Sequence, residues 1–148
     1  MFENRPNIFS KKYGQWGPLF IRLVAGYHLI QGVMDNILYR LHMQEFISFL
    51  REHQLPYPTL AYLSVYTQFI CGCLFIAGYY QRIAALLMII NFIFAILFVH
   101  IGDVYANTFP ALFMLASSLS LFFSGAGKLS IDYYLQRKGK RNKRYNIR

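Results

Sequence analysis

Charged residues are scarce in this chain, and their scarcity excludes an ordinary water-soluble fold. Only 14% of the residues are charged and 56% are hydrophobic, whereas soluble domains are about 25% charged. Between Arg82 and Lys128 the only formal charge is Asp103. A run of this kind cannot be folded as exposed loops in water, so it indicates contact with lipid. In lipid it must be helical, because every backbone donor and acceptor needs a partner within the chain.

Cysteine is also scarce, which excludes a disulfide framework. Cys71 and Cys73 are the only two cysteines, and on a helix residues two apart point in nearly opposite directions. We therefore expect tight helix packing around Gly72 rather than a redox pair. The sequence also lacks a motif for binding flavin, haem or an iron–sulfur cluster. Any redox chemistry would have to be shared with a partner protein.

Long apolar segments are abundant, and four of them are long enough to cross a membrane, which takes roughly 20 helical residues. The first is the least apolar, because it contains Arg22, His28, Gln31 and Asp35. The turn between the second and third is short, which predicts an antiparallel hairpin. The predicted fold is an all-α membrane protein, an antiparallel bundle of four transmembrane helices within residues 1–136. The expected spans run from about Gly17 to Leu38, Thr59 to Tyr80, Arg82 to Ile101 and Asn107 to Ser124.

The segment between the first two spans predicts a short amphipathic helix in the first outer loop. Tyr39, Met43, Phe46 and Leu50 recur at helical spacing with polar residues between them. Two placements are open for this helix. It can lie flat on the outer membrane surface, or it can fold over the mouth of the bundle.

The distribution of positive charge predicts the orientation. Of the 15 lysines and arginines, only Arg40 and Arg51 fall in the predicted outer loops. Lysine and arginine collect on the cytoplasmic side of membrane proteins, so both termini are predicted to be cytoplasmic. Residues 137–148 form a basic tail that we expect to be disordered. Because the tail follows a span, its charge indicates binding to anionic lipid headgroups rather than to nucleic acid.

Polar side chains inside the spans are the candidate functional residues. His28, Gln68 and Asn91 each lie midway along a span, and polar groups in hydrocarbon need partners. We therefore expect all three to meet in one layer near the middle of the membrane. This layer is either a site for a quinone-like ligand or a proton transfer, or a set of hydrogen bonds that holds the helices together. His28 is the candidate catalytic residue, because its charge can change near neutral pH.

A second candidate group, Asp35, His100 and Asp103, lies toward the outer face. Asp35 shares one face of the first span with His28 and Gln31, and the other two residues end the third span. Their spacing is not typical of a metal site, so a hydrogen-bonded or interfacial cluster is expected and no metal is predicted.

Arg22 lies about one turn into the first span, on the side predicted to be cytoplasmic. It can extend to the lipid headgroups, or it can pair with Asp132 beyond the fourth span. Of these two, the ion pair is preferred.

Four segments of the chain resemble the DoxX family of small bacterial membrane proteins with four spans. They are RLVAGYHLIQG (Arg22–Gly32), GCLFIAGYYQRIAAL (Gly72–Leu86), FVH (Phe98–His100) and GAGKLSIDYYL (Gly125–Leu135), in the order of the family. One position departs from the family pattern. The family often carries a glutamate about four residues before the glycine matched by Gly72, whereas this sequence has Gln68, whose amide does not titrate.

The resemblance implies an integral protein of the bacterial inner membrane. Family members look related to the membrane subunit of thiosulfate:quinone oxidoreductases, and some are linked to membrane redox complexes for sulfur or oxidative stress. It thus implies at most a subunit of a quinone-linked oxidoreductase, with quinone as the candidate cofactor and redox proteins as partners. The alternative is a non-enzymatic scaffold or assembly factor that binds lipids or proteins. A homo-oligomer is compatible with both.

Overall fold

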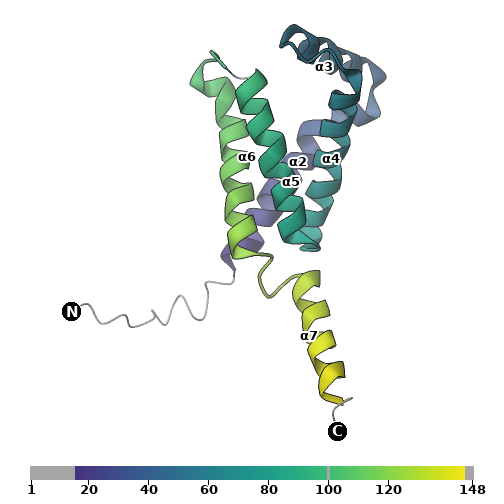
Figure 1. Ribbon diagram of the computed structural model, residues 1–148, viewed down its shortest axis with the longest axis vertical. Coiled ribbons are helices and arrows are strands. Elements are labelled where there is room, and N and C mark those ends of the chain that lie inside the picture. Colours follow the sequence, from purple (N-terminus) through teal and green to yellow (C-terminus); the bar gives the residue numbers. More distant parts are fainter. Residues whose placement is uncertain (1–15, 100, 146–148) are drawn as a thin grey trace, which may run out of the picture.

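The computed structural model describes residues 16–99 and 101–145, and these residues form helices joined by short loops (Figure 1). The side chains from residue 140 onward lie outside this description. In chain order the helices are α2 (Gly17–Leu38), α3 (Arg40–Glu52), α4 (Pro58–Ala77), α5 (Gln81–Phe94), the π-helix η1 (Ala95–Val99), α6 (Tyr105–Ser124) and α7 (Ile131–Tyr145).

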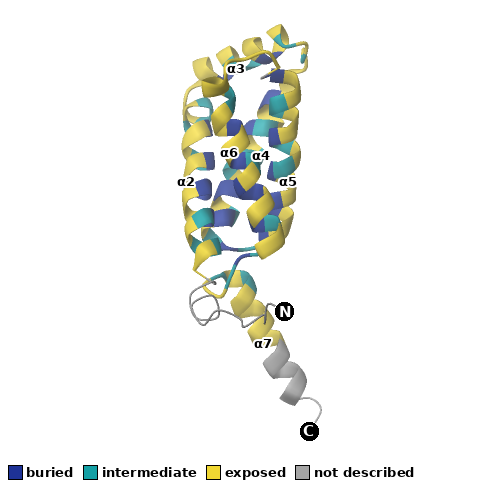
Figure 2. Cartoon of the chain, turned by 90° about the vertical axis from the view of Figure 1, so that its left-hand side faces the viewer, coloured by how far each residue is buried: buried dark blue, intermediate teal, exposed yellow. Residues whose placement is uncertain are grey.

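Helices α2, α4, α5 and α6 stand side by side as one bundle, with α3 over one end and α7 beyond the other (Figures 1 and 2). Helix α2 packs against α4 and α6, and α5 packs against the same two helices. The contacts therefore close a ring in the order α2, α4, α5, α6. Figure 2 shows the buried residues on the sides of these helices that face one another.

Three helical segments among the described residues are long and apolar enough to cross a membrane: Pro58–Ala77, Gln81–Val99 and Tyr105–Ser124. They correspond to the second, third and fourth predicted spans. Helix α2 has a sufficient length of 22 residues, but its polar side chains lower its mean hydropathy. The chain is thus a helical membrane protein, with α2 as its least apolar long helix.

Glycine sets the distance between α2 and α4. A Cβ atom added to Gly26 would lie 2.8 Å from the carbonyl oxygen of Gly72, and one added to Gly72 would lie 2.9 Å from that of Gly26. The two backbones therefore touch directly where they cross, which small residues permit in membrane helices.

Helix α3 folds over the end of the bundle through its apolar side. Met43 and Leu50 are buried and cluster with Val33 of α2 and with Ala61 and Val65 of α4. Of the two placements that the sequence left open, these contacts favour the helix that covers the bundle.

Helix α7 extends further than the sequence indicated. Disorder was predicted from residue 137 onward, whereas α7 is helical to Tyr145. Ser130 directly precedes the helix, and its Oγ accepts a hydrogen bond from the backbone N–H of Tyr133 at 3.2 Å. The lysines and arginines that follow have high helix propensity, so the capped start can continue. Residues 146–148 of the tail lie outside the described residues.

Candidate functional site

A cavity of about 220 Å³ lies between α3, α4 and the α5–η1 segment. Most of its lining is apolar and includes Phe46 and Phe49 of α3, Leu60 of α4 and Phe92 of α5. Its polar lining comes from three side chains: Ser64, Gln68 and Asn91. A small apolar space with a few convergent polar groups is the usual form of a ligand site.

The three polar side chains form a hydrogen-bonded chain between α4 and α5. Gln68 Nε2 donates to Ser64 Oγ at 3.0 Å, and Ser64 Oγ donates to Asn91 Oδ1 at 2.9 Å. Within the described chain, the NH₂ group of Asn91 and the carbonyl oxygen of Gln68 make no hydrogen bond. The cluster therefore keeps both a donor and an acceptor available to a ligand.

A π-helix forms one wall of this cavity. Helix α5 changes at Ala95 into η1, and Ala95 and Val99 both line the cavity. A π-turn is wider than an α-turn, and such turns occur frequently at functional sites. The irregular turn thus coincides with the cavity and its polar cluster.

The structure brings Gln68 and Asn91 together, but it does not bring His28 to them. His28 is exposed on α2, whose buried face is formed by residues such as Ala25, Leu29 and Val33. The prediction from depth alone placed all three in one layer, yet depth does not fix the direction of a side chain around a helix. Ser64 was missed, although it lies one turn before Gln68 on the same face of α4.

The second candidate group is only partly described. Asp35 is exposed and lines an open pocket of about 360 Å³ with His42 and Glu45, and His42 Nδ1 lies 3.0 Å from Glu45 Oε2. Asp103 is exposed in the loop before α6. His100 lies outside the described residues, so its grouping with Asp35 and Asp103 stays a prediction. No cluster of three or more potential metal ligands occurs in the parts of the chain that the structure describes.

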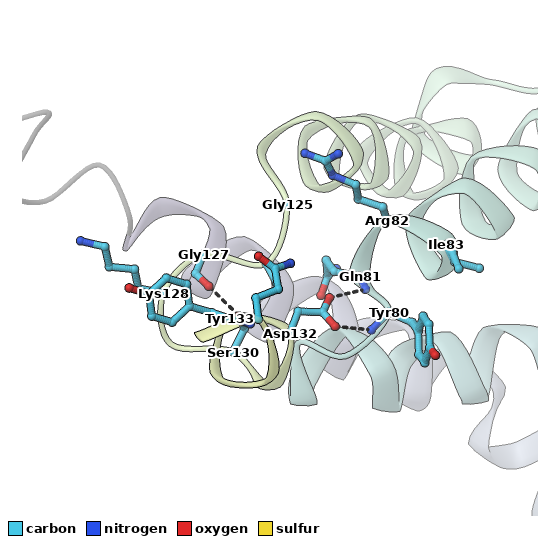
Figure 3. Close-up of a pocket in the computed structure, with 12 residues that line it drawn as sticks. Tyr80, Gln81, Arg82, Ile83, Gly125, Gly127, Lys128, Ser130, Asp132 and Tyr133 are labelled. Carbon is cyan, nitrogen blue, oxygen red and sulfur yellow. Dashed lines mark hydrogen bonds between the residues drawn. The ribbon is translucent and has the colours of Figure 1, made fainter. Parts of the chain in front are cut away.

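Arg22 is buried at the end of the bundle next to α7, where it binds backbone carbonyl groups. Its Nη1 donates to the carbonyl oxygen of Ala126 at 3.2 Å, and its Nη2 donates to that of Leu129. Asp132, the preferred partner from the sequence, instead accepts the backbone N–H groups of Tyr80 and Gln81, each at 3.0 Å (Figure 3). Tyr80 is the residue before α5 and Gln81 is its first residue, and the N–H groups at a helix start lack partners within the helix.

A wider open cavity of about 680 Å³ lies at this same end, beside Arg82, Lys128 and Asp132 (Figure 3). Two of its polar side chains already serve the fold, whereas the buried side-chain amide of Gln81 makes no hydrogen bond within the described residues. Asp132 caps α5, and Ser130 Oγ donates to the carbonyl oxygen of Gly127 at 2.6 Å. We therefore place this cavity at the junction between helices and keep the smaller cavity as the candidate functional site.

The DoxX family model matches residues 17–101 of the chain. The matched range contains α2 to η1 and all three polar residues of the cavity. The segment Gly125–Leu135 lies beyond it. No curated protein and no solved structure shows a significant match.

Proposed function

Because the chain belongs to the DoxX family, we propose that it is a four-span protein of the bacterial inner membrane that binds a quinone-type headgroup for a redox complex. Three of its helices are apolar enough to span. The fourth span of this proposal is α2, whose 22 residues give a length of about 33 Å at 1.5 Å per residue. That length suits a hydrocarbon core of about 30 Å. The four helices would then run antiparallel.

The cavity at Ser64, Gln68 and Asn91 carries the ligand part of this proposal. Pockets for drug-sized ligands measure about 300–1,000 Å³, so about 220 Å³ suits a smaller group such as a single substituted ring. The free NH₂ group of Asn91 is a donor for a ring carbonyl. The phenylalanines of the lining offer faces and edges for ring packing.

The same residues limit what the chain can contribute. A quinone accepts two electrons and two protons when it is fully reduced. None of the three polar side chains titrates near neutral pH, so the cavity binds and orients a ligand but does not supply protons. Electrons and protons would come from a partner protein, which makes this chain a subunit rather than a complete enzyme.

Purification in mild detergent followed by mass spectrometry of the extracted lipids tests the proposal. We expect quinone to be retained by the native chain. Asn91→Leu, which keeps the size but removes the amide, should lower the retained quinone roughly tenfold, since an unmade buried hydrogen bond costs about 1–3 kcal/mol.

Ser118→Ala is the matched control. Ser118 is a fully buried polar residue of α6 whose hydroxyl donates to the carbonyl oxygen of Met114 in the same helix, and it does not line the cavity. Absence of quinone from the native protein, or equal quinone in both variants, would contradict the proposal.

A membrane scaffold or assembly factor is the second candidate. The observation in its favour is the outward face of α2, where the polar side chains of His28, Gln31 and Asp35 are exposed. A scaffold would also use the exposed Arg137 and Lys138 of α7 to bind anionic headgroups. Retention of quinone separates the two functions, because a scaffold needs no ligand in the cavity.

A further inference from the structure

The open cavity of about 680 Å³ at the α7 end of the bundle, called the junction cavity below, is lined in part by an unsatisfied polar side chain. Gln81 lines it and is only 1% exposed. Neither the NH₂ group nor the oxygen of its side chain has a hydrogen-bond partner within the described residues. Burying an amide without partners is costly. This side chain therefore indicates a group from outside the chain that carries both an acceptor and a donor.

Two cations of the junction cavity are also without partners. Arg82 and Lys128 are exposed and line it (Figure 3), and neither forms an ion pair or a side-chain hydrogen bond within the part of the chain that is described. The carboxylate of the lining, Asp132, already accepts two backbone N–H groups at the start of α5, and Arg22 lies close enough to attract it. The uncompensated charge of the cavity is thus positive, which favours an anionic ligand.

The first turn of α5 adds backbone donors to the same cavity. Arg82 and Ile83 are the second and third residues of α5, and both line the cavity. The N–H groups at a helix start lack partners within the helix, and the positive end of the helix dipole favours an anion. Backbone N–H groups, a guanidinium and an amide are together the donors that bind a phosphate group.

The junction cavity lies where lipid headgroups meet the bundle. Two spanning segments end at Ala77 and Ser124, and the third begins at Gln81. A segment of 20 residues is about 30 Å long, which matches the hydrocarbon core, so these ends lie at the boundary with the headgroups. Tyr80 and Ile83 line the cavity with large exposed side chains, which offer apolar contact to the adjoining acyl chains.

We propose that the junction cavity binds the headgroup of an anionic phospholipid whose phosphate carries a hydroxylated group, as in phosphatidylglycerol. Arg82 and the N–H groups of α5 bind the phosphate, and Lys128 attracts it from the other rim of the cavity. A headgroup hydroxyl donates to the side-chain oxygen of Gln81, whose NH₂ group donates to a headgroup oxygen. An ethanolamine headgroup suits the site less well, because its ammonium group would lie near two cations.

The bound phosphate would connect two parts of the chain. Arg82 belongs to α5, and Lys128 belongs to the loop between α6 and α7. A Cβ atom at Gly125 in that loop would lie 3.9 Å from Arg82 Nε, so the two parts already approach each other. The junction cavity shares no lining residue with the cavity at Asn91, and the lipid site is therefore independent of the proposed function.

Native mass spectrometry of the full chain in detergent tests the lipid site. The protein is titrated with phosphatidylglycerol, with phosphatidylethanolamine of the same acyl chains, or with soluble glycerol 3-phosphate. We expect phosphatidylglycerol to bind roughly tenfold or more tightly than phosphatidylethanolamine, since each basic residue attracts an anionic headgroup. Glycerol 3-phosphate should not be retained at the same concentration. Equal binding of the two lipids, or tighter binding of glycerol 3-phosphate than of phosphatidylglycerol, would overturn the proposal.

Arg82→Gln tests the cation that binds the phosphate. We expect the dissociation constant of phosphatidylglycerol to rise roughly tenfold, since a hydrogen bond between charged groups is lost. The control is Arg137→Gln, which removes the same charge from an exposed position of α7 outside the cavity. It should change the constant by less than about twofold, because a separate exposed charge is screened by salt. Equal effects would show that general positive charge holds the lipid, which contradicts a site.

Gln81→Leu separates a ligand contact from a purely structural role. Leucine keeps the side chain buried and removes its unsatisfied polar atoms, so without lipid the variant should be at least as stable to heat as the native chain. Its affinity for phosphatidylglycerol should nevertheless fall roughly three- to tenfold, since its hydrogen bonds to the headgroup are lost. Unchanged affinity in the folded variant would show that the amide does not face the headgroup, and the proposal would fail.

Discussion

At the scale of single residues, Arg22 shows how one buried cation can order a loop. Its side chain is only 3% exposed and binds the carbonyl groups of Ala126 and Leu129 between α6 and α7. A guanidinium presents several donors in one plane, so a single arginine can hold both carbonyls. Gly78, at the end of α4, leaves the space that this arrangement requires. A Cβ atom there would overlap Arg22 Nη1.

Replacing Gly78 with alanine should therefore lower the free energy of unfolding by more than the strain at its positive φ accounts for. Gly78 has φ +64° and Gly102 has φ +85°, so alanine is strained at both positions. Only at Gly78 would the new methyl group displace Arg22, which should add about 1–3 kcal/mol of destabilisation. Unfolding of Gly78→Ala and Gly102→Ala in detergent measures the difference. Equal losses of stability would show that Arg22 can move without cost.

The candidate site was predictable in part from single residues. Asn91 and Gln68 are amides at similar depth in neighbouring spans, and the structure joins them through Ser64. His28 has the same depth, but the small residues Ala25 and Gly26 turn the other side of α2 toward the bundle. A hydroxyl one turn from Gln68, and small residues on one face of α2, were the signals that could have corrected the prediction.

At the scale of elements, the α2–α4 pair depends on one glycine contact. Gly72→Ala would place a methyl group 2.9 Å from the carbonyl oxygen of Gly26, and a backbone oxygen cannot rotate away as a side chain can. We expect a loss of about 1–3 kcal/mol in unfolding free energy, measured by denaturant titration of the monomer in detergent. Gly32→Ala is the control within α2, because its methyl group meets nothing within 4 Å. A similar loss from both substitutions would argue against close packing at Gly72.

The helices themselves were largely predictable, because apolar runs flanked by helix breakers define their ends. Pro58 occupies the first turn of α4, where its missing N–H is not needed, and Gly78 ends that helix with φ +64°. The π-turn at Ala95–Val99 could not be predicted, since its apolar residues also suit an ordinary α-helix. The length of α7 was missed because charge density alone suggested disorder, while the cap at Ser130 favoured a helix.

At the scale of the whole molecule, the two ends of the bundle differ in charge. Arg22, Arg82 and Lys128 lie at the end where α7 begins, and α7 adds further exposed cations. The opposite end carries α3, which includes both Glu45 and Glu52 among its exposed residues. Since lysine and arginine collect on the cytoplasmic side, this asymmetry favours the α7 end as the cytoplasmic one.

Labelling of single cysteines with a membrane-impermeant maleimide tests this orientation. In a chain with Cys71→Ala and Cys73→Ser, Arg51→Cys reports on α3 and Gln136→Cys reports on α7, and both positions are exposed. We expect Arg51→Cys to react in intact cells and Gln136→Cys to react only after the inner membrane is opened. The two cysteines lie at opposite ends of one bundle, so each serves as the control for the other. The reverse pattern would place α7 outside, and reaction of both in intact cells would mean that the bundle does not separate the two compartments.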